Sequence, residues 1–306
     1  CGVSDQFEAE LVWMDIEEGY VGRNYYFQLA SSATNATLSE IKYKYDVNSF
    51  EHFSGKSLGL NDIAKVQIRL DQKIPFEPYD ECPSLGAFVL VDRYSHATVA
   101  AGMIRYELRR ASNIHLQNMS VDRPSREKLA GHKGSVIWLT GLSGAGKSTI
   151  ADAAETLLHA QGFRTYILDG DNIRHGLSND LGFTNADRVE NIRRIAEVAK
   201  LFLDAGVIVM TSFISPFRAE RDMARALFEP DDFMEVFIDA PLDVAESRDP
   251  KGLYKKARSG ELPNFTGIDS AYEAPANPEL VLKTDESSIA EAADKLVDSI
   301  RKNISH

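Results

Sequence analysis

The sequence predicts an all-β barrel domain followed by an α/β domain in which helices flank a parallel sheet. Short β-rich runs with an approximate period of two occupy the first part of the chain, as in antiparallel strands. Apolar strands alternate with helical segments in the second part, as in parallel sheets. The polar stretch SVDRPSREKLAGHKG separates the two parts. We therefore expect a barrel over residues 1–118, a linker over 119–134 and an α/β domain over 135–306.

Each domain has its own set of expected strands. In the first, the runs are FEAELVWMD, NYYFQLAS, LSEIKYKYDV, AKVQIRLDQKI, GAFVLVDRY and ATVAAGMIRYEL. In the second, the strands are Val136–Thr140, Thr165–Asp169, Val207–Thr211 and Val236–Asp239. Because parallel strands end at one edge of a sheet, we expect the side chains that follow these strands to form a ligand site.

The first parallel strand runs directly into the complete phosphate-binding pattern G-x-x-x-x-G-K-[ST]. Glycines let the backbone wrap closely around phosphates, and the following helix adds its positive dipole end. We expect Lys147 to reach the β- and γ-phosphates and Ser148 to ligate Mg²⁺. The alternative, a glycine-rich turn with an incidental lysine, fits the complete pattern poorly. The pattern predicts that a nucleoside triphosphate is bound by Gly141, Leu142, Ser143, Gly144, Ala145, Gly146, Lys147, Ser148 and Thr149.

Composition limits the class of protein. The chain has 306 residues, of which 43% are hydrophobic and 26% charged, so we expect a soluble globular protein with room for two cores. A formal net charge of -12 argues against a general nucleic-acid binder. We expect no membrane span, and the two cysteines, Cys1 and Cys82, fit a reducing cytoplasm. The chain begins with Cys rather than Met, so we expect a fragment of something longer.

Six motifs follow one another in the second part: GLSGAGKST, LDGDNIRHGL, LGFTNADRVENIRRIAEVAK, TSFISPFRAERD, DPKGLYKKARSGELPNFTGID and PELVLKTD. Together they resemble the adenylylsulfate kinases, which use ATP to phosphorylate the 3′-hydroxyl of adenosine 5′-phosphosulfate (APS). The resemblance covers roughly Gly134–Lys302. It implies an α/β P-loop kinase that uses ATP and Mg²⁺.

Two carboxylates follow the strand Thr165–Asp169. At the carboxyl edge of a parallel sheet, Asp169 is a candidate Mg²⁺ ligand, and Asp171 could accept a hydroxyl proton. The structural alternative is an acidic turn that caps the next helix. The resemblance implies substrate contacts in the segment 171–174, and we expect Asp171 to lie nearest the attacking 3′-hydroxyl.

The resemblance implies further substrate contacts. Arg174 and Arg188 suit a phosphosulfate because a planar guanidinium matches paired anionic oxygens. We expect Phe183 and Phe265 to clamp the adenine, although either could be a loop phenylalanine tucked into the core. Arg193 and Arg194, by contrast, are expected to form surface ion pairs with Glu190 and Glu197. The full set of expected substrate contacts is Asp171, Asn172, Ile173, Arg174, Phe183, Arg188, Asn191, Ile214, Ser215, Lys251, Asn264 and Phe265.

The basic segment DPKGLYKKAR has the composition of a lid that closes over nucleotides, although a solvated basic helix is the alternative. Within it the resemblance implies a substrate contact at Lys251, and we expect the preceding Arg248 to cover the ATP base. Ser215 matches a serine described in the family as a phosphoryl acceptor, whereas direct in-line transfer from ATP needs no such intermediate. The expected catalytic residues are Lys147, Asp171, Ser215 and Lys251.

The first domain has no phosphate-binding loop. Its segment Leu60–Ile104 resembles the last barrel of translation-factor-type GTPases, most closely that of the large, GTP-binding subunit of sulfate adenylyltransferase. The GTPase domain itself is missing, so we do not expect GTP hydrolysis. The implied partners are the small subunit of that enzyme and a second copy of this chain, paired through the kinase domain. We do not expect His52, His96 and His115 to form a metal site.

The expected reaction converts ATP and APS into ADP and 3′-phosphoadenosine 5′-phosphosulfate (PAPS), in sulfate activation. Another P-loop small-molecule or nucleotide kinase is one alternative, and it would differ in the acceptor pocket. A non-catalytic nucleotide-binding scaffold is the other. The combination of Lys147, Ser148 and Asp171 favours catalysis over a scaffold.

Overall fold

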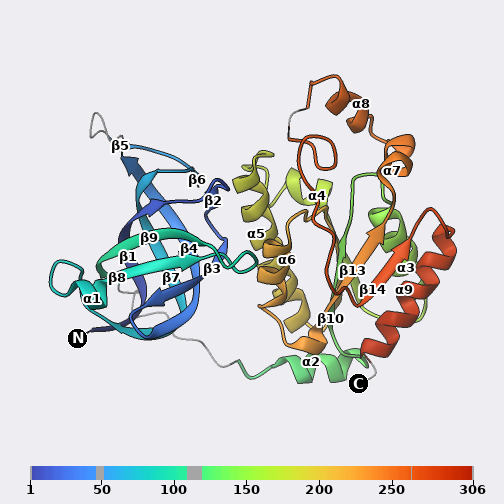
Figure 1. The fold of residues 1–306 in the computed structure, drawn as a ribbon. Coiled ribbons are helices and arrows are strands. Elements are labelled where there is room, and N and C mark those ends of the chain that lie inside the picture. Colours follow the sequence, from blue (N-terminus) through green and yellow to red (C-terminus); the bar gives the residue numbers. More distant parts are fainter. Residues whose placement is uncertain (1, 46–51, 109–118, 263, 305–306) are drawn as a thin grey trace. The chain divides into compact units, whose positions relative to one another are not determined.

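The computed structural model describes residues 2–45, 52–108, 119–262 and 264–304. The chain divides into two compact units, Cys1–Asn118 and Met119–His306, each with its own hydrophobic core (Figure 1). Cys1 and His115, named above, lie outside the described residues.

The first unit is a closed antiparallel β-barrel. Its strands follow the order β3-β8-β9-β1-β7-β4, and pairing of β4 with β3 closes the ring. The barrel strands are β1 (Gly2–Trp13), β3 (Asn24–Leu29), β4 (Ser32–Tyr45), β7 (Ile63–Phe76), β8 (Ala87–Val91) and β9 (Thr98–Glu107). The smaller elements are β2 (Gly19–Tyr20), β5 (His52–Phe53), β6 (Ser57–Leu58) and α1 (Pro83–Gly86).

Alternate side chains fill the barrel. Phe7, Leu11 and Trp13 of β1 are buried in its interior. The ring of Phe27 stacks on Phe7 and Phe88, with centroids 6.5 and 4.8 Å away. Burial of each such side chain contributes about 1.5–3 kcal/mol. The period-two runs of the sequence therefore form the barrel that they predict.

The second unit is a parallel sheet of order β11-β12-β10-β13-β14 between two layers of helices (Figure 1). Apolar side chains of α3 and α9 cover one face, and those of α5 and α6 cover the other. The strands are β10 (Ser135–Thr140), β11 (Thr165–Asp169), β12 (Ile208–Ser212), β13 (Phe233–Asp239) and β14 (Leu280–Lys283). The helices of these layers are α3 (Lys147–Ala160), α5 (Asn185–Asp204), α6 (Arg218–Arg225) and α9 (Ile289–Ile304). Among the described residues, no helix is both long and apolar enough to span a membrane.

The expected parallel strands are present, with ends shifted by up to three residues. The edge strand β14 is not predicted, because a run of four residues is too short to distinguish from a loop.

Part of the stretch expected as a linker is helical. Helix α2 (Arg123–Ala130) begins where the Asp122 carboxylate accepts a hydrogen bond from the backbone N–H of Ser125. Pro124 lies in its first turn, where its missing N–H costs nothing. The Arg123 guanidinium pairs with Asp232 at 2.6 Å, which ties the helix to the short 3₁₀ turn η1 (Pro230–Asp232). The polar composition that suggested a linker thus belongs to a capped surface helix.

Candidate active site

The carboxyl ends of the parallel strands border a pocket of about 890 Å³ in the second unit. The glycine-rich loop after β10 forms one wall, and the turns after β11 and β12 contribute others. Further side chains come from α5 and from the segment that follows α7 (Leu242–Arg248). The pocket is thus at the sheet edge where the sequence predicts a ligand site.

Backbone packing requires glycine at two positions of the loop. Gly141 and Gly144 have φ values of 153° and 73°. A Cβ at Gly141 would lie 2.4 Å from the carbonyl oxygen of Ile238, and one at Gly144 would lie 2.7 Å from that of Ala245. Helix α3 begins at Lys147, directly after the loop. The loop and the helix N-terminus therefore present backbone N–H groups to an anion in the pocket.

The Lys147 side chain is buried and folds back on the loop. Its Nζ donates hydrogen bonds to the carbonyl oxygens of Gly141 at 3.0 Å and Leu142 at 2.8 Å. Burial, followed by the nearby charge of Lys251, lowers the pKa of Lys147 to about 8. The ammonium is poorly solvated, so a phosphate oxygen would be a much better partner than two neutral carbonyls.

Ser148 and Asp169 provide adjacent oxygen ligands. The Ser148 hydroxyl donates to Asp169 Oδ2 at 2.7 Å and lies 3.0 Å from the Ser212 hydroxyl. The other carboxylate oxygen of Asp169 accepts the backbone N–H of Asp171 at 3.0 Å and caps α4 (Gly170–His175). Hydroxyl and carboxylate oxygens suit Mg²⁺. Asp169 can therefore cap the helix with one oxygen and face a metal with the other.

Asp171 forms an ion pair with Lys251, which lies between α7 and α8 (Leu253–Arg258). Both side chains are more than half exposed, at 61% and 56%. Exposed pairs of this kind contribute little to stability. The pair can therefore separate and find new partners when substrates bind.

A cationic and aromatic wall forms the other part of the pocket. The Arg174 guanidinium lies 4.6 Å from the ring centroid of Phe183, which is 60% exposed. Arg188 donates to the Thr266 hydroxyl at 2.7 Å and to the carbonyl oxygen of Asn264. Burial lowers the pKa of both arginines. Partly desolvated guanidinium groups of this kind favour an anionic ligand.

Asn191 and Phe265 also line the pocket, and both side chains are buried. The Oδ1 atom of Asn191 is buried and has no hydrogen-bond partner in the described part of the chain. Phe265 is only 7% exposed and packs edge-on against Tyr254, with centroids 4.9 Å apart. Phe183 and Phe265 both line the pocket, but Phe183 is largely exposed whereas Phe265 is buried.

Known proteins share this unit. The adenylylsulphate kinase family matches residues 133–283. An adenylyl-sulfate kinase of Aeromonas salmonicida is 60% identical over 191 residues, which are 62% of this chain and 97% of that protein. The chain belongs to the adenylylsulphate kinase family. A structure of the Mycobacterium tuberculosis APS kinase CysC in complex with AMPPNP and APS matches with 50% identity and a TM-score of 0.53, covering 55% of this chain and 98% of that one.

The barrel that precedes the kinase unit is also shared. It matches the GTP-eEF1A C-terminal domain-like family over residues 6–105. The bifunctional enzyme NodQ of Rhizobium tropici is 52% identical over 302 residues, which are 99% of this chain and 48% of that protein. The chain thus spans about half the length of the curated relatives it matches. These matches confirm the predicted fold class and the predicted adenylylsulfate kinase class.

One contact in the kinase unit is not predicted from the sequence. Thr284, directly after β14, donates its hydroxyl hydrogen to the carbonyl oxygen of Ala145 at 2.9 Å. Arg248 donates to that hydroxyl at 3.0 Å and to the Thr284 carbonyl oxygen at 2.6 Å. Arg248 is therefore fixed beside the phosphate-binding loop. The motif PELVLKTD contains Thr284, but only the fold brings it to the loop.

The kinase unit buries Ser215, which is 2% exposed. Its hydroxyl accepts a hydrogen bond from the indole N–H of Trp138 at 3.3 Å, and no other partner for it occurs among the described residues. A neutral donor does not activate a hydroxyl for nucleophilic attack. This environment favours a binding role for the Ser215 turn over a covalent relay.

Most of the predicted contact residues of the kinase unit line the pocket, and four do not. Gly141 and Leu142 offer their carbonyl oxygens to Lys147. Asn172 is exposed, and Ile173 packs on the apolar core under α5. Ligand contacts of these four residues stay a prediction.

Arg193 and Arg194 form ion pairs with acidic side chains of the kinase unit. They pair with Glu190 at 2.7 and 2.9 Å, and Arg194 pairs with Asp180 at 2.6 Å. The expected surface ion pairs with Glu190 are therefore present.

Proposed function

We propose that the kinase unit transfers the γ-phosphoryl group of ATP to the 3′-hydroxyl of APS, giving PAPS and ADP. The observation that carries this proposal is a single pocket that joins a complete phosphate-binding loop to the cationic and aromatic wall of Arg174, Phe183 and Arg188. The loop suits the triphosphate of ATP. The second wall suits an adenine nucleotide whose phosphosulfate carries fixed negative charge.

Positioning and charge neutralisation account for the chemistry. The loop holds the triphosphate while Lys147 exchanges two carbonyl oxygens for phosphate oxygens. Asp171 orients the 3′-hydroxyl, and Lys251, released from Asp171, neutralises charge on the transferring group. Mg²⁺, held through Ser148 and Asp169, would neutralise the β- and γ-phosphate oxygens. A loose transition state needs good alignment more than a strong base.

The acceptor is held by groups of different kinds. Arg174 and Arg188 bind the phosphosulfate, and Phe183 stacks on the adenine. The buried Oδ1 of Asn191 has no hydrogen-bond donor among the described residues, and the ligand supplies that donor. Transfer is direct, because no base among the described residues hydrogen-bonds to the buried Ser215 hydroxyl.

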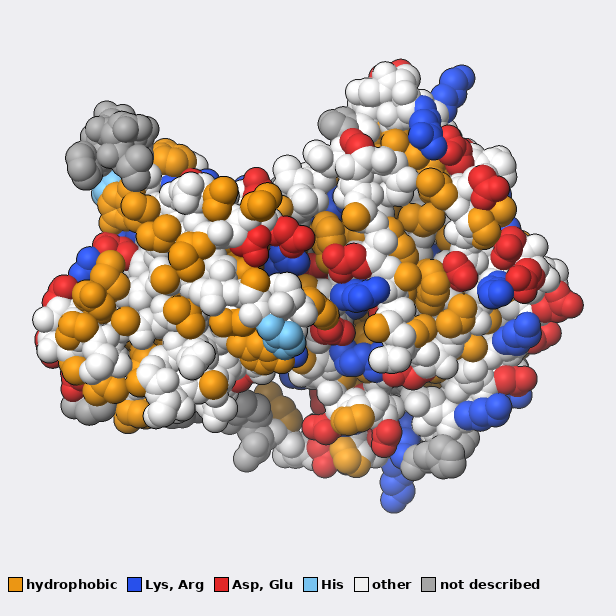
Figure 2. Space-filling model, viewed as in Figure 1, with side chains coloured by type: hydrophobic (Ala, Val, Ile, Leu, Met, Phe, Trp, Pro, Cys, Tyr) orange, Lys and Arg blue, Asp and Glu red, His pale blue; other side chains and the backbone are white. Residues whose placement is uncertain are grey.

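The partners and location form part of the same proposal. The small subunit of sulfate adenylyltransferase is the partner that the resemblance of the barrel to the large subunit implies, and a bifunctional relative matches this chain over 48% of its own length. The kinase unit forms a homodimer, on the strength of the family resemblance. A cytoplasmic location agrees with the two cysteines of the sequence. Nucleic acid is not a partner: the net charge is -12, and acidic and basic side chains intermingle among the described residues on the face shown in Figure 2.

A panel of acceptors tests the substrate. With ATP and Mg²⁺ held constant, we expect kcat/KM for APS to exceed that for AMP by at least about 100-fold, because AMP lacks the sulfate and offers fewer anionic oxygens to the Arg174 and Arg188 guanidinium groups. Preference for another acceptor would favour a different P-loop kinase. ATP binding without turnover of any acceptor would favour the non-catalytic scaffold.

A further inference from the structure

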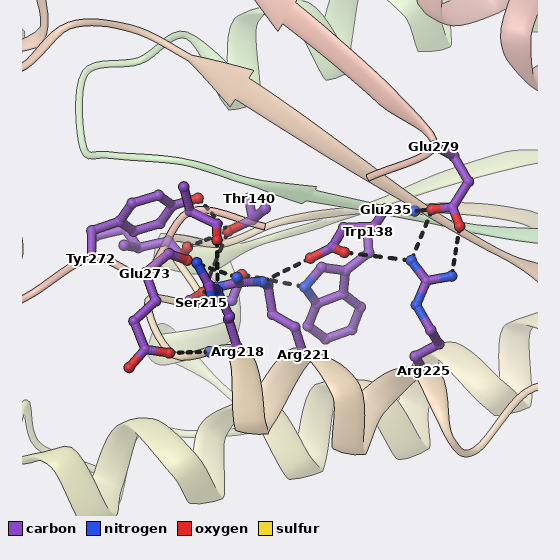
Figure 3. A network of polar contacts seen from close by, with 12 residues as sticks. Trp138, Thr140, Ser215, Arg218, Arg221, Arg225, Glu235, Tyr272, Glu273 and Glu279 are labelled. Carbon is purple, nitrogen blue, oxygen red and sulfur yellow. Dashed lines mark hydrogen bonds and ion pairs between the residues drawn. The ribbon is translucent and has the colours of Figure 1, made fainter. Parts of the chain in front are cut away.

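We propose that Arg221 is a positioning residue for the acceptor, and this inference rests on the proposed function. Its guanidinium holds the turn 214–216, which follows β12 and lines the pocket, in the conformation that meets the substrate (Figure 3). Arg221 is not among the residues that line the pocket. It acts through the backbone of Ser215.

The Arg221 guanidinium joins three parts of the kinase unit. It is 2% exposed, and its Nε donates to Glu235 Oε1 of β13 at 2.7 Å. Its Nη1 donates to the carbonyl oxygen of Ser215, and its Nη2 to that of Glu273, both at 2.7 Å. A planar fork can serve these acceptors at once, whereas a lysine ammonium could not keep the same directions.

The turn needs such support because its backbone is strained. Ser215 has a φ of 39°, which is unfavourable for a residue with a Cβ. The Thr140 hydroxyl donates to the carbonyl oxygen of Ile214 at 2.7 Å, and the Trp138 indole donates to the Ser215 hydroxyl at 3.3 Å. Figure 3 shows Thr140 and Trp138 at different sides of Ser215, while Arg221 reaches the turn from the helix below. A strained conformation persists only where its surroundings hold it in place.

Stability alone is a weak explanation for this arrangement. Arg221 and Glu235 form a nearly buried ion pair, with side-chain exposures of 2% and 9%. Desolvation can cancel the attraction of a buried pair, and apolar replacements are often no less stable. A buried pair that also holds a strained turn at the pocket points instead to positioning.

Arg225 offers a matched control one helical turn further along α6. It pairs with Glu279 at 2.7 Å and with the other oxygen of Glu235 at 3.4 Å. Within the described part of the chain, its hydrogen bonds do not reach the 214–216 turn, and it does not line the pocket. Arg225→Lys therefore perturbs the same ion-pair network without reaching the turn.

The decisive comparison is Arg221→Lys against Arg225→Lys in the full chain. We expect Arg221→Lys to raise the KM for APS by roughly tenfold while the KM for ATP stays within about twofold, because the turn shifts and the loop does not. Arg225→Lys should leave both KM values within about twofold of the wild type. Equal effects of the two variants, or equal effects on both substrates, would overturn the proposal.

A second readout does not depend on activity. The chain has two tryptophans, and each indole N–H can be followed by ¹⁵N NMR after assignment with Trp13→Phe. Arg221→Lys should move the Trp138 signal, which reports on the Ser215 hydroxyl, and leave the Trp13 signal, which reports on Glu17 in the barrel. An unmoved Trp138 signal would contradict the proposal even if no PAPS were formed by the wild type.

Glu235→Gln covers the case in which Arg221→Lys does not fold. It keeps an oxygen acceptor for Arg221 Nε but removes the charge that anchors the guanidinium. We expect the same selective rise in KM for APS, smaller in size, with the same NMR change. A folded Glu235→Gln chain without either change would overturn the proposal. Loss of folding in both variants would do so as well, because the pair would then serve stability alone.

Discussion

At the scale of single residues, Lys147 connects burial to nucleotide affinity. Its pKa of about 8 lies below the ordinary 10.5, chiefly because burial disfavours the ammonium. A bound triphosphate favours the ammonium and raises that pKa. The Kd of a non-hydrolysable ATP analogue should therefore be flat below pH 8 and rise by about tenfold per pH unit above it.

Titration calorimetry in two buffers of different ionisation enthalpy checks this prediction. Proton uptake should accompany binding above pH 8 in the wild type and disappear in Lys147→Met, which keeps the side-chain length without the charge. Proton release, or uptake that persists in the variant, would contradict the assigned role of Lys147.

Phe183 carries a second prediction at this scale. Its ring is 60% exposed and lies against Arg174, so it contributes little to the core. Phe183→Ala should raise the KM for APS by about tenfold through lost stacking, with kcat and the melting temperature nearly unchanged. Leu201→Ala is the control, because Leu201 is 71% exposed and does not line the pocket. An equal KM for APS in both variants would show that Phe183 does not contact the acceptor.

At the scale of elements, the phosphate-binding loop depends on its fit against β13. Gly141 and Gly162 both have positive φ, but only at Gly141 would a Cβ meet a neighbour, the Ile238 carbonyl oxygen at 2.4 Å. Gly141→Ala should therefore weaken ATP binding by at least about 100-fold. Gly162→Ala should leave ATP binding unchanged, since nothing lies within 4 Å of its Cβ position. Fluorescence titration with a labelled nucleotide measures the Kd of the Gly141→Ala and Gly162→Ala variants and checks this difference.

Some elements and contacts of the kinase unit could be predicted from the sequence, and others could not. The loop and the parallel strands are local patterns, so the strand, the glycines and Lys147 are predicted together. Helix α2 and strand β14 are missed because a polar helix and a run of four residues lack a strong period. Thr284 and Arg221 lie within quoted motifs, but their contacts with Ala145 and Glu273 join residues far apart in the chain and depend on the fold. Phe265 was expected to clamp the adenine; it lines the pocket with Tyr254 packed edge-on against its ring, and the clamp stays a prediction.

At the scale of the whole molecule, the two units have separate cores. A chain of residues 119–306 should therefore fold alone and keep kcat/KM for APS within about threefold of the full chain. The Aeromonas salmonicida kinase agrees with this expectation, since 97% of it matches only 62% of this chain. Scanning calorimetry of the shorter chain checks that it folds, and the kinetic assay with APS checks its kcat/KM. An unfolded or inactive shorter chain would show that the kinase unit needs the barrel.

The most direct measurement follows ADP and the 3′-phosphorylated product in one tube, with ATP and Mg²⁺, in the presence and absence of APS. We expect ADP to form in step with PAPS only when APS is present. Lys147→Ala should lower this rate by at least about 1,000-fold through lost phosphate neutralisation. Bound ATP without PAPS formation, or undiminished turnover by Lys147→Ala, would contradict the assignment of this pocket to APS phosphorylation.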